Sequence, residues 1–226
     1  EVEDVEDVEL DMVEVFLGAR YAPGFYAWLM PKEDGLAKVG LGARAADPRE
    51  FLRRLMVKHP VASKKLRGAR VRRLTVHPIT LGGPVGRSFS DGFLAVGDAA
   101  SQVKSTTGGG VVFGLTGAGI AAEVVAEAVR QGRFSSDFLS SYQKRCDEVL
   151  GFDAGMMVRM RRTLDGLSDE RLDRLVGLCS RLELDKTLRS VKDIDFQGRA
   201  LLRVLRSPRV LVALGYFFFS FLFANL

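Results

Sequence analysis

Histidine, cysteine and tryptophan are scarce in this 226-residue chain, which has two histidines, two cysteines and one tryptophan. With only His59 and His77 available, a histidine-rich metal site or a Ser-His-Asp triad has little support. Cys146 and Cys179 lie far apart and neither belongs to a C-x-x-C pair. We therefore expect reduced thiols in a cytoplasmic protein and no metal centre.

Basic residues are missing from the first 18 positions, which carry eight acidic side chains: Glu1, Glu3, Asp4, Glu6, Asp7, Glu9, Asp11 and Glu14. The rest of the chain holds all 33 Lys and Arg residues, although the net formal charge of the whole is only +5. A basic body suits nucleic acid or an anionic membrane surface. Zinc-ligand spacing, a recognition-helix pattern and an aromatic ladder are all missing, so we expect no nucleic acid as a partner.

Apolar and acidic residues alternate from Val8 to Met12 and slip phase at Val13, which predicts a half-buried strand with a bulge over 8–18. The sequence EDG at 33–35 has the composition of a tight turn. A short second strand is expected from Lys38. These strands predict a sheet in the first part of the chain.

A well-delimited helix is predicted between Asp47 and Pro60. Asp47 is a favourable N-cap, Pro48 suits the first helical position, and Glu50 completes a capping box. The face that we expect to be buried carries three apolar residues: Phe51, Leu52 and Leu55. The next segment, 69–80, has the pattern of another strand and is followed by glycine-rich turn sequence.

Four consecutive apolar residues, Phe93 to Val96, are typical of a strand that is covered on both faces, as in a parallel sheet. This strand is expected to end before Asp98. A helix rich in glycine and alanine is predicted from Gly110 to Val129, with Gly132 at its C-terminal end. Beyond Phe134 the sequence has the pattern of successive helices.

Asp98 stands at the carboxyl end of this predicted strand, where open α/β sheets bind their ligands. Its carboxylate accepts hydrogen bonds from hydroxyl groups, so a sugar-like polyol is a natural partner, and capping of the next turn is the alternative. Gly108, Gly109 and Gly110 allow backbone N–H groups to approach a flat or charged ligand, at a helix start whose dipole favours negative charge. A flexible hinge is the alternative for the glycines. Together, the strand, the aspartate, the glycines and the helix favour a ligand site.

The segment GFLAVGDAASQVKSTTGGGVVFGLTGAGIAAE resembles the second flavin-binding fingerprint of the geranylgeranyl reductase family, within the para-hydroxybenzoate hydroxylase-like flavoproteins. The resemblance implies that Asp98 binds the ribityl chain of FAD, and that the backbone of Gly110 and Val111 faces the isoalloxazine ring. The family commonly has a proline where this chain has Ser105, which loosens the loop without removing a contacting group. The implied cofactor-binding residues are Gly97, Asp98, Gly108, Gly109, Gly110 and Val111.

A second segment, Arg20 to Gly42, resembles the family's Y-x-W-x-F-P-K motif, which belongs to the substrate domain. Tyr26 and Trp28 alternate on one strand face and offer a flat apolar wall with polar tips. A core strand packed on its own helix is the alternative. Met30 replaces the usual aromatic residue and Lys38 the usual asparagine. The resemblance implies substrate contacts at three positions: Tyr26, Trp28 and Pro31.

The family's first glycine motif, G-x-G-x-x-G, and its later D-G segment are not found in this sequence. The resemblance therefore implies the C-terminal portion of a longer flavoprotein. We expect a partner half, in the same chain or in trans, to bind the adenosine side of FAD. Without that nucleotide-binding half, we expect the chain to hold FAD weakly.

The expected fold class is α+β, as a partial FAD-dependent oxidoreductase fold. We expect a portion of the substrate domain at 1–80, the C-terminal part of an FAD-binding domain at 81–133 and a C-terminal helical region at 134–226. The resemblance implies flavin-dependent reduction of carbon–carbon double bonds in geranylgeranyl or other polyprenyl chains of membrane ether lipids. The sequence does not identify the catalytic residues, and Tyr26 is the candidate for the proton donor. The alternatives are an FAD-dependent monooxygenase or halogenase and a non-catalytic, membrane-associated remnant.

The last 17 residues, 210–226, contain no charge and six aromatic side chains. This length is at the lower limit for a membrane-spanning helix. Arg199, Arg203 and Arg206 share one helix face just before it, with Arg209 following, and such a cluster suits anionic head groups. A buried helix that closes a hydrophobic substrate tunnel is the alternative. We expect peripheral association with the membrane, and a prenylated lipid as the substrate.

Overall fold

The structure is a computed structural model that describes residues 1–189, 195–205 and 207–222. The chain divides into two compact units, Glu1–Pro78 with Leu167–Val176, and Ile79–Gly166 with Gly177–Leu226. Each unit has a hydrophobic core of its own. Helices and an antiparallel sheet occur side by side in sequence, so the predicted α+β class is confirmed.

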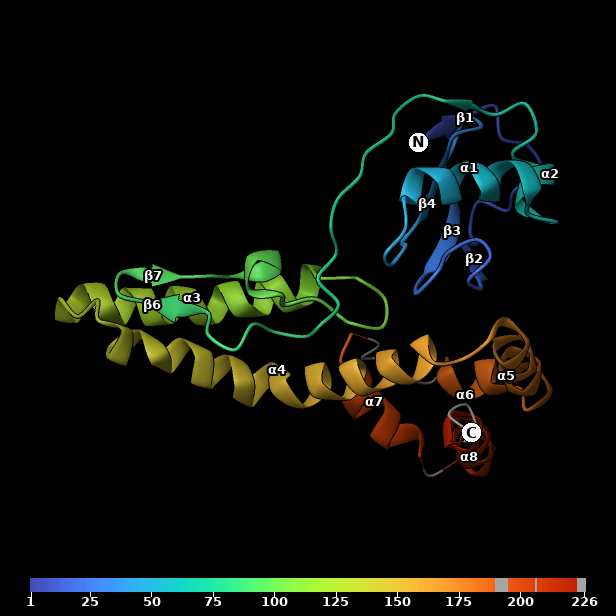
Figure 1. Ribbon diagram of the computed structural model, residues 1–226. Coiled ribbons are helices and arrows are strands. Elements are labelled where there is room, and N and C mark those ends of the chain that lie inside the picture. Colours follow the sequence, from blue (N-terminus) through green and yellow to red (C-terminus); the bar gives the residue numbers. More distant parts are fainter. Residues whose placement is uncertain (190–194, 206, 223–226) are drawn as a thin grey trace. The chain divides into compact units, whose positions relative to one another are not determined.

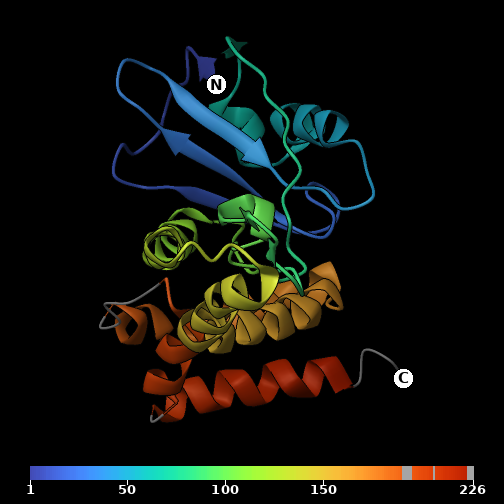
Figure 2. The same cartoon turned by 90° about the vertical axis from the view of Figure 1, so that its left-hand side faces the viewer.

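A five-stranded antiparallel sheet forms the first unit (Figure 1). Its strands lie in the order β2-β3-β4-β1-β5. Their bounds are β1 (Val2–Glu3), β2 (Glu14–Leu17), β3 (Tyr26–Pro31), β4 (Ala37–Leu41) and β5 (Arg70–Val71). Two helices, α1 (Pro48–Lys58) and α2 (Ala62–Lys65), cover one face of this sheet (Figure 2).

The core of this unit lies between the sheet and its two helices. Ala27, Leu29 and Ala37 of the strands pack with Leu55 of α1 and Ala62 of α2, and all five are fully buried. Burial alternates along β3, as the period of two along a strand requires. The alternate side chains of β3 therefore point to the opposite face of the sheet, away from the helices.

The predicted start of α1 is confirmed. Asp47 is the N-cap and accepts a hydrogen bond from the N–H of Arg49 at 2.9 Å, and Pro48 is the first helical residue. The reciprocal half of the predicted capping box is not formed, because the carboxylate of Glu50 accepts a hydrogen bond from Arg54 at 2.8 Å. The helix is therefore capped from one side.

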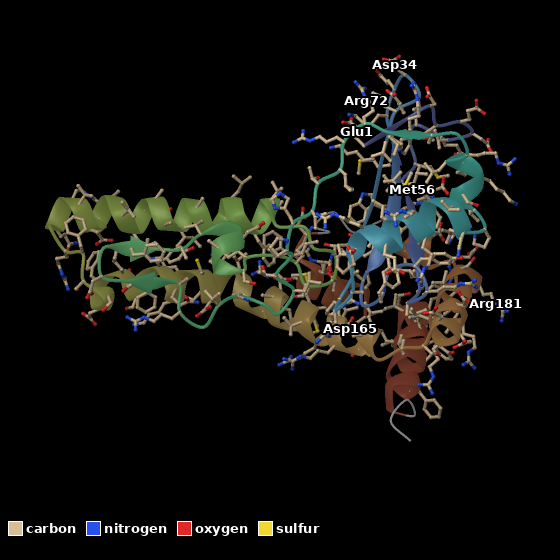
Figure 3. All side chains as sticks on the ribbon, turned by 45° about the horizontal axis from the view of Figure 1, so that its top comes forward. Glu1, Asp34, Met56, Arg72, Asp165 and Arg181 are labelled. Carbon is tan, nitrogen blue, oxygen red and sulfur yellow. The ribbon has the colours of Figure 1, made fainter. Side chains whose placement is uncertain are left out.

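The turn predicted at 33–35 joins β3 to β4. Asp34 and Gly35 both have positive φ, at 58° and 67°, as the central residues of a type I′ turn do. The carbonyl of Gly35 accepts a hydrogen bond from the N–H of Val5 at 3.0 Å. Figure 3 shows Asp34, Glu1 and Arg72 at this same end of the unit.

Two strand predictions in this unit are wrong in their limits. Of the strand predicted over 8–18, only Glu14–Leu17 pairs, with β3, and 8–12 is not a strand. Of the predicted strand at 69–80, only Arg70–Val71 pairs, with β1. Alternation of apolar residues sets which way side chains face, but a strand also needs a neighbour for its backbone hydrogen bonds.

A helical hairpin forms the second unit. In it α3 (Val111–Gln131) and α4 (Ser136–Asp165) lie side by side (Figure 1). A small strand pair, β6 (Phe89–Ser90) and β7 (Phe93–Leu94), packs on α4 and is followed by the 3₁₀ turn η1 (Gly97–Ala100). The remaining helices are α5 (Asp169–Arg181), which runs from the first unit into the second, α6 (Leu184–Leu188), α7 (Gln197–Val204) and α8 (Pro208–Leu222).

The predicted glycine-rich helix is confirmed as α3, with Gly132 in the left-handed conformation at its C-terminal end. The predicted parallel strand at 93–96 is wrong. Phe93–Leu94 pairs in antiparallel fashion with Phe89–Ser90, and the side chain of Phe93 is 58% exposed. A strand of a parallel sheet needs a parallel neighbour, and the antiparallel β6 is the only neighbour of β7 among the residues that the structure describes.

Candidate functional site

Asp98 and Gly110 lie together at the start of α3. A Cβ atom at Gly110 would stand 3.0 Å from Oδ1 of Asp98 and 3.4 Å from the carbonyl oxygen of Gln102. The bare Cα of Gly110 therefore lets the carboxylate sit beside the helix N-terminus, where the helix dipole favours negative charge. The structure thus brings together the two elements of the predicted cofactor site.

The loop that carries Asp98 packs along a row of glycines on α3. A Cβ atom at Gly114 would lie 3.4 Å from Cα of Gly97, and one at Gly117 would lie only 2.7 Å from Cδ of Gln102. These glycines and Gly110 are spaced by four and three positions, so they share one helix face. Side chains there would push the loop away from the helix.

The segment between this loop and α3 is closed by its own backbone. The backbone carbonyl of Lys104 accepts a hydrogen bond from the N–H of Gly108 at 2.7 Å. The backbone N–H of Lys104 donates to the carbonyl of Gly109 at 2.9 Å. Gly108 has a φ of 74°, which favours glycine. Two side-chain contacts, Lys104 with Asp195 and Thr106 with Gln197, fasten the segment to the start of α7. The glycines therefore form a held loop in this structure.

The N-terminus of α3 has no side-chain cap. Gly110 occupies the N-cap position and has no side chain to accept from the first-turn N–H groups. Val111, the first helical residue, is 76% exposed. Nearby, the hydroxyl of Ser105 is buried and lacks a hydrogen-bond partner among the described residues. An uncapped helix start beside an exposed carboxylate is suited to a ligand that presents both hydroxyl groups and partial negative charge.

The predicted substrate residues Tyr26 and Trp28 lie on the sheet face that α1 and α2 leave uncovered. Their ring centroids are 5.7 Å apart, and the ring of Phe25 stacks on Tyr26 at 4.4 Å. A Cβ atom at Gly40 would lie 2.6 Å from Cε2 of Trp28, so the indole ring covers that glycine closely. Because Gly40 has no side chain, Trp28 can lie flat on the sheet.

Neighbouring residues extend this surface. Val15 of β2 is directly opposite Trp28 and Leu17 is directly opposite Tyr26, and paired residues of antiparallel strands share a face. We call this surface the apolar wall, defined by Val15, Leu17, Tyr26, Trp28 and Met30. Pro31, the third residue for which the resemblance implied a substrate contact, lies on the other face of the sheet and is buried there.

A buried polar group that no sequence pattern predicts lies behind the Asp98 loop. Oε1 of Gln102 accepts a hydrogen bond from the N–H of Gly97 at 2.8 Å, and its Nε2 donates to Tyr142 Oη at 2.8 Å and to Cys146 Sγ at 3.7 Å. Tyr142 in turn donates to the carbonyl of Ala95 at 3.0 Å. Burial raises the pKa of Tyr142 to about 12, so its hydroxyl remains a donor at neutral pH.

Known proteins resemble the chain over most of its length. Residues 1–72 match the family model described as the geranylgeranyl reductase catalytic domain. The chain is 37% identical over 210 residues to digeranylgeranylglycerophospholipid reductase 2 of Methanothermobacter thermautotrophicus, a match that covers 88% of this chain and 51% of that protein. The chain belongs to the geranylgeranyl reductase family.

Other members of the geranylgeranyl reductase family show the same relationship. Digeranylgeranylglycerophospholipid reductase 2 of Methanopyrus kandleri is 35% identical over 210 residues, which cover 91% of this chain and 52% of that protein. The fold matches the crystal structure of a geranylgeranyl bacteriochlorophyll reductase-like protein from Thermoplasma acidophilum with a TM-score of 0.74 at 24% identity, over 96% of this chain and 53% of that one. The chain therefore spans about half the length of the relatives that it matches.

Proposed function

We propose that the chain is the ring-side and substrate-side part of an FAD-dependent reductase, which reduces carbon–carbon double bonds in geranylgeranyl chains of membrane lipid precursors. One observation carries the proposal: the carboxylate of Asp98 lies against the bare N-terminus of α3 at Gly110. The names of its relatives, reductases of digeranylgeranylglycerophospholipid, support the choice of substrate.

The residues at this site fit a flavin. The exposed carboxylate of Asp98 can accept hydrogen bonds from ribityl hydroxyl groups, and the N–H groups of Gly110 and Val111 can face the polar edge of the ring. Gly97, Gly108 and Gly109 leave room for close approach to the backbone. When bound, the flavin supplies the hydride. The helix N-terminus stabilises negative charge on the ring by about 0.3–1 kcal/mol at an exposed site, and by more where water is excluded.

The apolar wall fits a prenyl chain. Val15 and Leu17 are 55% and 47% exposed, which is unusual for neighbouring aliphatic side chains on a sheet face. Each methylene group of a substrate that is buried there contributes about 0.8 kcal/mol. Tyr26 and Trp28 add flat surface with polar tips, so we assign to this wall the binding of the chain and the exclusion of water.

A nucleotide-binding half is part of the proposal. α3 is long and apolar enough to cross a membrane by length and composition, and 28% of that stretch is buried. Four aliphatic side chains lie exposed along one stripe of α3: Val111, Leu115, Val125 and Val129. The relatives contain about as much chain again. We propose that this additional half, in the same chain or in trans, binds the adenosine side of FAD and covers the stripe.

Peripheral attachment to the cytoplasmic face of the membrane is also proposed. Leu211, Val212 and Phe219 of α8 are more than half exposed. Two of the arginines grouped with this segment have ion-pair partners, because Arg199 contacts Asp153 at 3.0 Å and Arg209 contacts Glu183 at 3.4 Å. Arg206 and residues 223–226 lie outside the described part of the chain. The apolar side chains of α8 therefore support the attachment more than the arginines do.

A fusion protein tests the function. The N-terminal half of the Methanothermobacter thermautotrophicus relative is placed ahead of this chain, and FAD binding is measured with and without Asp98→Ala. The variant should bind FAD more weakly by about 1.5–3 kcal/mol, the contribution of a hydrogen bond to a charged group, whereas Asp137→Asn on the surface of α4 should not. Unchanged FAD affinity in Asp98→Ala would contradict the assignment. Anaerobic reduction of a geranylgeranyl lipid by the reduced fusion separates a reductase from a monooxygenase, because a monooxygenase requires oxygen.

A further inference from the structure

The side-chain amide of Gln102 joins three elements of the second unit. It is 4% exposed, and its two ends bind different partners: Oε1 accepts from Gly97 of the η1 turn, and Nε2 donates to Tyr142 of α4. Its flat face lies against α3 at Gly117. We propose that Gln102 is a positioning residue that holds Asp98 in place for the flavin, an inference that rests on the proposed function.

The position of Gly97 determines the position of Asp98. Gly97 immediately precedes Asp98 and has a φ of 66°, so its conformation is one that most other residues avoid. Its N–H is held by Oε1 of Gln102, and its carbonyl accepts from the N–H of Gln102 at 3.0 Å. These two hydrogen bonds close the turn on both sides. Loss of the side-chain bond would free one end of the turn that presents Asp98.

The bridge is anchored in the most buried part of the hairpin. Tyr142 is 0% exposed and Cys146 is 6% exposed, and both pack in the core between α3 and α4. The hydroxyl of Tyr142 uses its hydrogen for Ala95 and its lone pair for Gln102. The hydroxyl therefore acts as both donor and acceptor. This fixes the direction of each hydrogen bond in the series that links Ala95, Tyr142, Gln102 and Gly97.

Only an uncharged donor and acceptor side chain of this length satisfies both partners. A leucine at position 102 would leave the N–H of Gly97 without its acceptor and the oxygen of Tyr142 without the donor from Gln102. An ionised glutamate has two acceptors and no donor, so it would bind Gly97 and compete with Ala95 for the hydroxyl of Tyr142. A protonated glutamate regains a donor. Glutamine at this position is therefore matched in both polarity and charge.

The first experiment uses the 226-residue chain and does not require flavin. Hydrogen exchange is followed at the amide of Gly97 in the wild type, Gln102→Leu and Gln102→Glu. We expect exchange at Gly97 to be at least tenfold faster in Gln102→Leu, and amides in the centre of α4 to retain their protection. Exchange at Gly97 that is equal in all three proteins would overturn the inference.

The second experiment measures FAD affinity of the fusion protein at about pH 5.5 and about pH 8. Burial raises the pKa of a carboxyl group, so Gln102→Glu should be neutral at the lower pH and ionised at the higher. Tyr142 and Cys146 contact the position and Asp147 lines the same small cavity, while α3 presents Gly117. Burial raises the pKa of both Tyr142 and Cys146, so neither becomes charged in this range.

Gln102→Glu should bind FAD like the wild type at about pH 5.5 and about tenfold more weakly at about pH 8, a loss comparable with one hydrogen bond. Gln131→Glu, which adds the same charge on the exposed end of α3, is the control and should show no such change relative to the wild type. A ratio of variant to wild-type affinity that is constant with pH would overturn the role of Gln102. If Asp98→Ala instead leaves FAD affinity unchanged, the flavin assignment fails, and the exchange experiment still decides whether Gln102 holds the turn.

Discussion

Replacement of Gly40 by alanine tests the apolar wall without a flavin or a substrate. The added methyl group would overlap Cζ2 of Trp28 and would lie 2.6 Å from Cε2, and real Cβ contacts are not that short. The indole is a rigid ring system and cannot yield by bending. It must therefore tilt or lift from β4, or the two strands must separate.

The free-energy cost of Gly40→Ala follows from the number of indole atoms that the new methyl group would displace. Two indole atoms lie inside the contact limit, which corresponds to the overpacking of a well-packed site and costs about 1–3 kcal/mol. The strands themselves are held by the ladder between β3 and β4, where Trp28 is paired with Gly40. Movement of the indole is less costly than breaking this ladder, so we expect the ring to move and the fold to persist.

The assay uses the fact that Trp28 is the only tryptophan in the chain. We expect Gly40→Ala to shift the fluorescence emission to longer wavelength and to lower the free energy of unfolding by about 1–3 kcal/mol in urea. Gly82→Ala is the matched control, because a Cβ there meets no atom within 4 Å. If Gly40→Ala has the emission and the stability of the wild type, then Trp28 does not lie on Gly40 and the wall is not built as described.

Three further predictions concern the cofactor, the proposed nucleotide-binding half and the membrane. Gly110→Val should place a branched side chain against Asp98 and abolish FAD binding by the fusion while its circular dichroism spectrum is retained; normal FAD content would mean that the ring does not approach this position. Leu115→Lys should reduce the association of the chain with a separately expressed nucleotide-binding half, measured by ultracentrifugation, and Lys144→Ala on α4 should not; equal association would place the partner elsewhere. The chain should co-sediment with anionic vesicles at low salt, and Leu211→Glu should release it; no sedimentation of the wild type would contradict the membrane proposal.

The cofactor segment could be predicted from sequence because its signals are local. Gly110 and Gly132 mark the ends of α3, and each acts through the conformation of its own backbone. The pairing of Asp98 with the helix start also depends on a short stretch of chain. The roles of these residues in flavin binding stay predictions.

The strands were predicted less well because their limits depend on distant partners. β2 begins at Glu14 since Leu29 of β3 is its neighbour, and no feature of 8–17 specifies which residues pair. The segment at 93–96 has the composition of a doubly covered strand, but its described neighbour is the antiparallel β6. The composition of a segment indicates how far it can be buried, but the segment that buries it lies elsewhere in the chain.

The tertiary contacts of the site could not be predicted at all. Gln102 binds Tyr142 and Cys146, which are 40 and 44 positions away, and one glutamine in a glycine-rich segment has no periodic pattern around it. Gly40 likewise has no turn or positive φ to explain it, and its reason is the ring of Trp28 on the next strand. Both cases become visible only when two segments are packed together.

The glycines within α3 have a consequence for the order in which the protein folds. Gly114, Gly117 and Gly119 lie within the helix, and each costs about 1 kcal/mol of helix stability relative to alanine. An isolated helix is marginal even with good helix formers, so α3 gains its stability from α4 and from the loop that carries Gln102. We expect α4 to become ordered first and the turn around Asp98 to form together with α3. A cofactor that binds at Asp98 would then stabilise α3 and this turn together.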